Sequence, residues 1–267
     1  MIPNTHRCEI THGQILFGVC PWCDVIIGKI RSDAPRVSKV NTRWYSSAVA
    51  AGIQSDDATV RDVTLSGLCH GWQLEEEMLA VFAIALAHTD RSFIDRVEFA
   101  LHGRAFNLSS AQIDWLERCC EKQNIELPAR ILLAAACQFK NTETPAVAAE
   151  AAQVRHVLWL IERNPRSSTL GMFGRIPSFR AQSDFESAKK LWQQHLAAIP
   201  DDVRILKNAG LFYFAEDPET SLQLLQRVVE IQPDPAIKSL IQLLGKINSI
   251  RSPVNPFDYW KDWKRDF

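Results

Sequence analysis

The sequence has no long apolar run and almost no net charge, and each absence excludes a class of protein. The apolar run around residues 79–87 is far shorter than the roughly 20 residues that span a bilayer. With 30 lysines and arginines against 31 aspartates and glutamates, the net charge is −1. Nucleic-acid binding would therefore need a local basic patch. The N-terminus also lacks the basic stretch and apolar core of a signal peptide, so we expect a cytoplasmic protein without a membrane partner.

Signature motifs of common enzyme classes are missing as well. The chain contains no Walker sequence, no G-x-G-x-x-G, no H-E-x-x-H and no G-x-S-x-G. It has seven cysteines, and an odd number without an export signal argues against a disulfide framework. The hydrophobic fraction of 46% is ordinary for a folded globular protein.

What is present at the N-terminus is a group of cysteines and histidines at metal-ligand spacing, within residues 1–32. Cys8 and His12 are separated by three residues, and Cys20 and Cys23 are separated by two. The tight turn of a Cys-x2-Cys pair directs both sulfurs at one point, and three thiolates with one imidazole can hold Zn²⁺ tetrahedrally. A segment this short cannot bury a stable core unaided, so zinc binding would fold it. We therefore expect a structural zinc site.

This segment resembles small zinc-ribbon modules whose first knuckle uses a cysteine and a histidine, and His6 competes with His12 for the fourth ligand position. A different interpretation is a thiol–disulfide oxidoreductase in which Cys20 and Cys23 form the redox pair. Against it, the β-branched run before Gly28 disfavours the helix that should follow such a motif. A third alternative is a zinc-ribbon nucleic-acid binder.

The rest of the chain carries helical signals. Ser109 and Gln112 stand at the spacing of a capping box. Asp217-Pro218 places a good N-cap before a proline at the first helical position. Gly103 is predicted to end the helix that begins near residue 92.

The second half shows a repeat. Pro165, Pro200 and Pro233 each follow a helical segment, and their spacings of 35 and 33 residues are close to the roughly 34 of a tetratricopeptide unit. In this register, small and large residues occupy the packing positions at which tetratricopeptide units have small and large residues. These are Ala188 and Trp192, then Ala209 and Phe212, then Ser221, Leu225 and Val228. Residues 145–250 therefore resemble the tetratricopeptide-repeat family, with residues 167–182 as a degenerate or opened first helix.

The resemblance implies a non-enzymatic scaffold that binds a protein or peptide on the concave face formed by the first helix of each unit. In the register above, that face includes Leu206, Gly210 and Tyr213. These three are the candidate binding residues.

The remaining cysteines and histidines are expected to be structural. Cys119 and Cys120 are adjacent on a helix and point about 100° apart, so we expect core packing of one and partial exposure of the other. Cys137 lies in an apolar stretch and should be buried. Four further histidines have no carboxylate or cysteine at ligand spacing and are expected at the surface or at helix ends. They are His88, His102, His156 and His195.

Together these features predict a mainly α-helical protein, an α–α superhelix of stacked helical hairpins with a small N-terminal zinc-ribbon-like β module. The expected segments are a zinc-ribbon-like module (1–32), a linker (33–56), a helical-hairpin region (57–143), tetratricopeptide-like repeats (144–250) and a C-terminal capping helix (251–267). The aromatic residues of the last segment are expected to cover the end of the repeats, with partner binding as the alternative.

Overall fold

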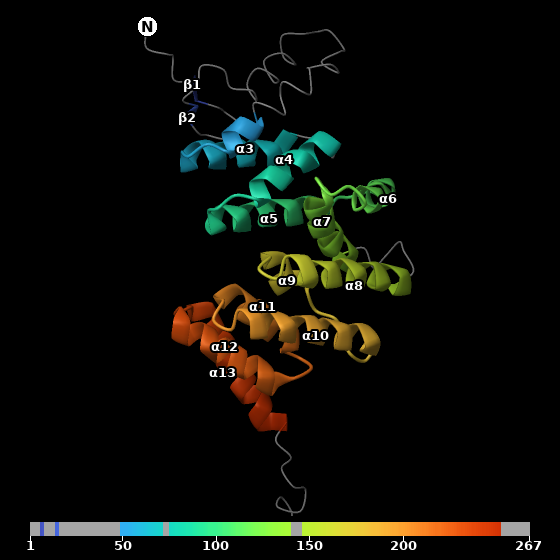
Figure 1. The fold of residues 1–267 in the computed structure, drawn as a ribbon, viewed down its shortest axis with the longest axis vertical. Coiled ribbons are helices and arrows are strands. Elements are labelled where there is room, and N and C mark those ends of the chain that lie inside the picture. The colour runs from blue at the N-terminus through green and yellow to red at the C-terminus, as the bar shows by residue number, and fades with distance from the viewer. Residues whose placement is uncertain (1–5, 8–13, 16–48, 72–74, 140–145, 252–267) are drawn as a thin grey trace, which may run out of the picture. The chain divides into compact units, whose positions relative to one another are not determined.

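The computed structural model describes residues 6–7, 14–15, 49–71, 75–139 and 146–251, which are mainly α-helical (Figure 1). This confirms the expected helical class. The chain divides into two compact units, residues 1–156 (unit 1) and residues 157–267 (unit 2). Within the described residues, no helix combines the length and hydropathy needed to cross a bilayer.

Two short strands are described near the N-terminus. β1 (His6–Arg7) pairs antiparallel with β2 (Gln14–Ile15), with His6 opposite Ile15 and Arg7 opposite Gln14. The four predicted zinc ligands lie outside the described residues, so the zinc-ribbon-like module stays a prediction. They are Cys8, His12, Cys20 and Cys23.

Unit 1 is built around one apolar helix. Its helices are α3 (Ala58–Gly71), α4 (Glu76–Leu86), α5 (Arg91–Ala105), α6 (Ser110–Cys119), α7 (Glu126–Phe139) and the first part of α8 (Ala146–Arg163). Helix α7 packs against α4, α5 and α6, and every residue from 131 to 137 is buried, including Cys137 as expected. Residues 49–53, inside the expected linker, are also helical, and Val49 and Ile53 are buried.

The predicted starts of two helices are confirmed. Ser109 caps α6, its hydroxyl accepting the N–H of Gln112 while the Gln112 side chain accepts the N–H of Ser109. Asp217 caps α12 (Pro218–Ile231) by accepting the N–H of Thr220, and Pro218 is the first helical residue. Both signals are local, because each cap satisfies backbone groups within its own first turn.

The predicted end of α5 is wrong. Gly103 lies inside the helix, which continues to Ala105, a residue only 1% exposed. A glycine within a helix costs only about 1 kcal/mol relative to alanine. The helix therefore continues past Gly103 to the buried Ala105.

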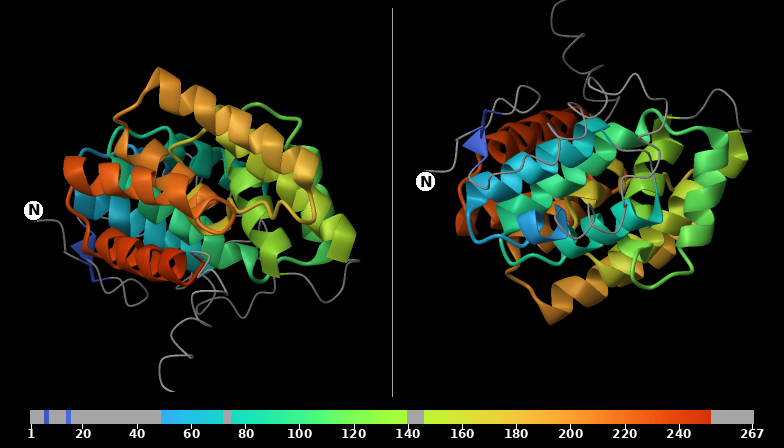
Figure 2. Two further views of the ribbon diagram at one scale, coloured as in Figure 1. Left: turned by 90° about the horizontal axis from the view of Figure 1, so that it is seen from below. Right: turned by 90° about the horizontal axis from the view of Figure 1, so that it is seen from above.

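Unit 2 continues α8 and adds a series of neighbouring helices. They are α9 (Ser168–Phe173), α10 (Gln182–Ala198), α11 (Val203–Tyr213), α12 and α13 (Pro235–Arg251). Helix α11 packs against α9, α10 and α12, and α12 packs against α13, beside which it lies in Figures 1 and 2. Helices α8, α10 and α12 end two residues before Pro165, Pro200 and Pro233, which confirms the predicted helix ends.

Helix α11 is anchored by polar contacts as well as apolar ones. The buried Asn208 donates from Nδ2 to the carbonyl oxygens of Pro165 and Ser167, at 2.9 and 2.8 Å. Asp202 caps the helix and also accepts from Arg166 Nε at 2.7 Å. These bonds hold α11 against the segment that precedes α9.

Candidate functional site

The three residues predicted to line a peptide groove lie inside unit 2. Leu206 and Tyr213 are each 3% exposed, and Leu206 belongs to an apolar cluster with residues of α12 and α13. Gly210 lies so close to α12 that a Cβ there would come within 2.8 Å of Leu225 Cδ2, and its carbonyl accepts from Ser221 Oγ at 2.7 Å. In this arrangement the three residues pack helices together, and their contact with a peptide stays a prediction.

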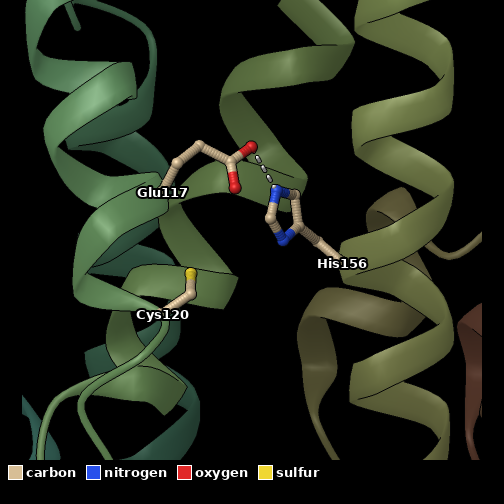
Figure 3. Close-up of side chains that lie close together, drawn as sticks. All are labelled: Glu117, Cys120 and His156. Carbon is tan, nitrogen blue, oxygen red and sulfur yellow. Dashed lines mark hydrogen bonds and ion pairs between the residues drawn. The ribbon is translucent and has the colours of Figure 1, made fainter.

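Unit 1 brings together a different set of metal-ligand side chains. A carboxylate oxygen of Glu117, the Sγ of Cys120 and a ring nitrogen of His156 all lie within 4.8 Å of one another. Figure 3 shows the three side chains pointing toward one another from facing helices. Carboxylate, thiolate and imidazole are the protein ligands of zinc, so this donor set can hold a metal ion.

The local sequence explains why these side chains face the interior of unit 1. Glu117 and Cys120 stand one turn apart at the end of α6, and Cys120 lies one turn after the buried Leu116. His156 lies on α8 one turn before the buried Leu160. Cys120 and His156 thus each share a helix face with an apolar residue that must be covered.

Both ring nitrogens of His156 have partners. Nε2 lies 3.0 Å from Glu117 Oε1, and Nδ1 lies 3.0 Å from an NH nitrogen of Arg130. A guanidinium only donates hydrogen bonds, so Nδ1 accepts and Nε2 carries the proton that points at Glu117. Arg130 also donates to Glu126 at 3.1 Å, and Arg155 donates to Glu117 at 2.6 Å.

Burial sets the protonation states of this cluster. It lowers the pKa of His156 to about 4, although the neighbouring Glu117 carboxylate acts in the opposite direction. It also raises the pKa of the Cys120 thiol to about 12. At neutral pH the imidazole is therefore neutral and the thiol is protonated. A protonated, buried thiol is a poor nucleophile, so this geometry does not favour a cysteine-dependent enzyme.

Sequence reasoning missed this cluster. His156 is fully buried inside α8, so the prediction that it lies at the surface or at a helix end is wrong. His102 does lie in the last turn of α5, but it is only 2% exposed. The predicted partial exposure of one member of the Cys119–Cys120 pair is also wrong, because both are buried. The apolar residues around His156 in α8 could have indicated that it is buried. Its partners come from α6 and α7, so no local spacing in the sequence indicates them.

No family model matches the chain, and no curated protein or solved structure gives a significant match to it. Function is therefore inferred from the packing and chemistry of the described residues.

Proposed function

We propose that the chain is a non-enzymatic scaffold of stacked, tetratricopeptide-like helical hairpins that binds a protein or peptide, with a structural zinc ion in its N-terminal segment. The observation that carries this proposal is burial at the repeat positions. The residues that the register assigns to helix–helix packing are all at most 2% exposed. They are Ala188 and Trp192 in α10, Ala209 and Phe212 in α11, and Ser221, Leu225 and Val228 in α12.

The order of packing supports the same proposal. Helices α10, α11, α12 and α13 each pack against the next in the chain, as in repeat proteins in which every unit contacts only its neighbours. Such units cannot bury their apolar faces alone, and stacking gives them an extended surface for partners. The zinc ion, held by Cys8, His12, Cys20 and Cys23, is proposed to stabilise a separate small module.

We place the partner contact at the irregular part of unit 2. Helix α9 has only 6 residues and is followed by the non-helical residues 174–181. Met172 and Phe179 in this segment are 58% and 75% exposed, and the guanidinium of Arg180 lies 5.2 Å from the centre of the Phe179 ring. Departures from a regular repeat often lie on the binding face, and aromatic and arginine side chains are common at binding hot spots.

Site-specific crosslinking tests the location of this contact. A photo-crosslinking residue replaces Phe179 in the full chain, and the same residue at Phe99, which is 70% exposed in unit 1, is the matched control. We expect a defined set of protein adducts at position 179, reduced by Met172→Glu in the same chain. Equal adducts at positions 179 and 99 would contradict the proposed surface.

Metal content and redox activity separate the scaffold from the oxidoreductase. The scaffold should bind zinc in the N-terminal segment, lose that ion when Cys20→Ser and Cys23→Ser are combined, and leave insulin disulfides intact. If the segment holds no zinc and the protein reduces insulin disulfides through Cys20 and Cys23, the oxidoreductase interpretation replaces the scaffold proposal. Salt-dependent DNA or RNA binding lost in the double variant would favour the nucleic-acid alternative.

A further inference from the structure

We propose that Glu117, Cys120 and His156 form a second metal site, in unit 1, for Zn²⁺ or another thiophilic divalent cation, and that metal binding competes with the hydrogen bond between Arg130 and His156. This site shares no residue with the N-terminal segment or with the proposed partner surface. It therefore stands independently of the proposed function.

The positions of the donor atoms support the site. In a tetrahedral zinc centre with bonds of about 2.0–2.3 Å, ligand atoms lie roughly 3.3–3.8 Å apart. Glu117 Oε1 and His156 Nε2 are already 3.0 Å apart, and Cys120 Sγ lies within 4.8 Å of one carboxylate oxygen of Glu117 and one ring nitrogen of His156. Cys120 is the C-cap residue of α6, where the backbone leaves the helix, so a small shift of its sulfur does not require the helix to move.

The metal-free cluster does not need the sulfur. Arg130, His156 and Glu117 satisfy one another's hydrogen bonds without Cys120. The thiol adds a soft donor where a carboxylate and an imidazole already meet, and this mixture suits zinc better than calcium or magnesium, which prefer oxygen ligands. Three protein ligands also leave a fourth tetrahedral position for water or an exchangeable ligand.

Metal binding changes the tautomer of His156. If Nε2 gives its lone pair to the metal, the ring proton must move to Nδ1, and the thiol of Cys120 releases its proton to solvent. Nδ1–H then faces the Arg130 guanidinium, and two donors cannot form a hydrogen bond. Arg130 must turn away, and Glu126, already 3.1 Å from one of its nitrogens, can hold it there. Arg130 is thus a positioning residue that opposes metal binding.

Cobalt binding tests the site in the full chain. The background carries Cys20→Ser and Cys23→Ser, which removes two of the four predicted N-terminal ligands, and the probe is Co²⁺, a spectroscopic substitute for Zn²⁺. We expect one Co²⁺ per chain with a thiolate-to-cobalt charge-transfer band, displaced by Zn²⁺. Cys120→Ser should abolish that band, whereas Cys119→Ser, at the adjacent buried cysteine, should keep it.

Arg130→Gln provides a test that does not depend on removing a ligand. The glutamine carbonyl can accept Nδ1–H, so we expect Co²⁺ affinity to rise about tenfold, within the range usual for outer-shell partners. A merely structural Arg130 would give no gain in Co²⁺ affinity.

The proposal is overturned if the Cys20→Ser/Cys23→Ser protein shows no charge-transfer band, if Cys120→Ser keeps it, or if Arg130→Gln binds Co²⁺ no tighter. None of these results affects the zinc content of the N-terminal segment or the crosslinks at position 179.

Discussion

His156 Nε2 lies 3.0 Å from Glu117 Oε1, although the two residues are 39 positions apart in the sequence and the whole of α7 lies between them. Arg130, from α7, contacts the other ring nitrogen, so one imidazole links α6, α7 and α8. The imidazole is fully buried, and the Glu117 side chain is 30% exposed. Removal of the Glu117 carboxylate would leave the buried Nε2–H of His156 without this acceptor, which commonly costs about 1–3 kcal/mol. The two hydrogen bonds of the His156 ring therefore help to specify how α6, α7 and α8 meet.

The close approach of α11 and α12 predicts that Gly210→Ala destabilises unit 2. The new Cβ would lie 2.8–2.9 Å from Leu225 Cδ2 and Cγ, and Leu225 is fully buried. Overpacking of this kind costs about 1–3 kcal/mol. The free energy of unfolding in urea, with hydrogen exchange in α11 and α12 to locate the effect, measures the loss. Gly245→Ala is the matched control, because its Cβ meets nothing within 4 Å. It should raise stability, by at most about 1 kcal/mol, and equal effects at the two glycines would refute the packing argument.

Two adjacent aspartates should differ in their contribution to stability. Asp202 accepts the N–H groups of Arg204 and Ile205 and the guanidinium of Arg166, so Asp202→Ala should cost about 1–2 kcal/mol. The Asp201 side chain is 64% exposed and pairs with Arg227 at the surface. Asp201→Ala should therefore cost no more than about 0.5–1 kcal/mol. Urea unfolding of the two variants gives the comparison, and a larger loss for Asp201→Ala would contradict the role of the cap.

Acid should destabilise unit 1 partly through His102. Burial lowers the pKa of this histidine from 6.5 to about 4, so between these values the unfolded chain binds more protons than the folded one. The stabilising contribution of neutral His102 is complete above about pH 6.5 and is lost as the pH falls toward 4, by at most about 3 kcal/mol. His102→Gln should flatten this loss.

Unfolding free energies at pH 7.5 and 4.5 measure the effect. His156 titrates in the same direction, so the variant should keep part of the pH dependence rather than lose all of it. An unchanged difference between the two pH values would show that His102 does not titrate as its burial requires.

Many of the helix starts and ends can be predicted from short stretches of sequence. The capping box of Ser109 and Gln112, the Asp217-Pro218 start and the prolines after α8, α10 and α12 act within one helical turn. Their effect therefore does not depend on the rest of the fold. The repeat register likewise anticipated which residues of α10, α11 and α12 would be buried, since a fixed helical period determines which side chains share a face.

Contacts between helices that are distant in the sequence could not be predicted from local patterns, because they depend on tertiary packing. Helix α5 continues past Gly103 to the buried Ala105, and Leu206, Gly210 and Tyr213 are covered by neighbouring helices of unit 2. The meeting of Glu117, Cys120 and His156 depends on how α6 and α8 pack around α7. Local spacing determines the face on which a side chain lies. The helix that covers that face determines which groups the side chain contacts. By removing water from the side chain, the same helix also determines its protonation state.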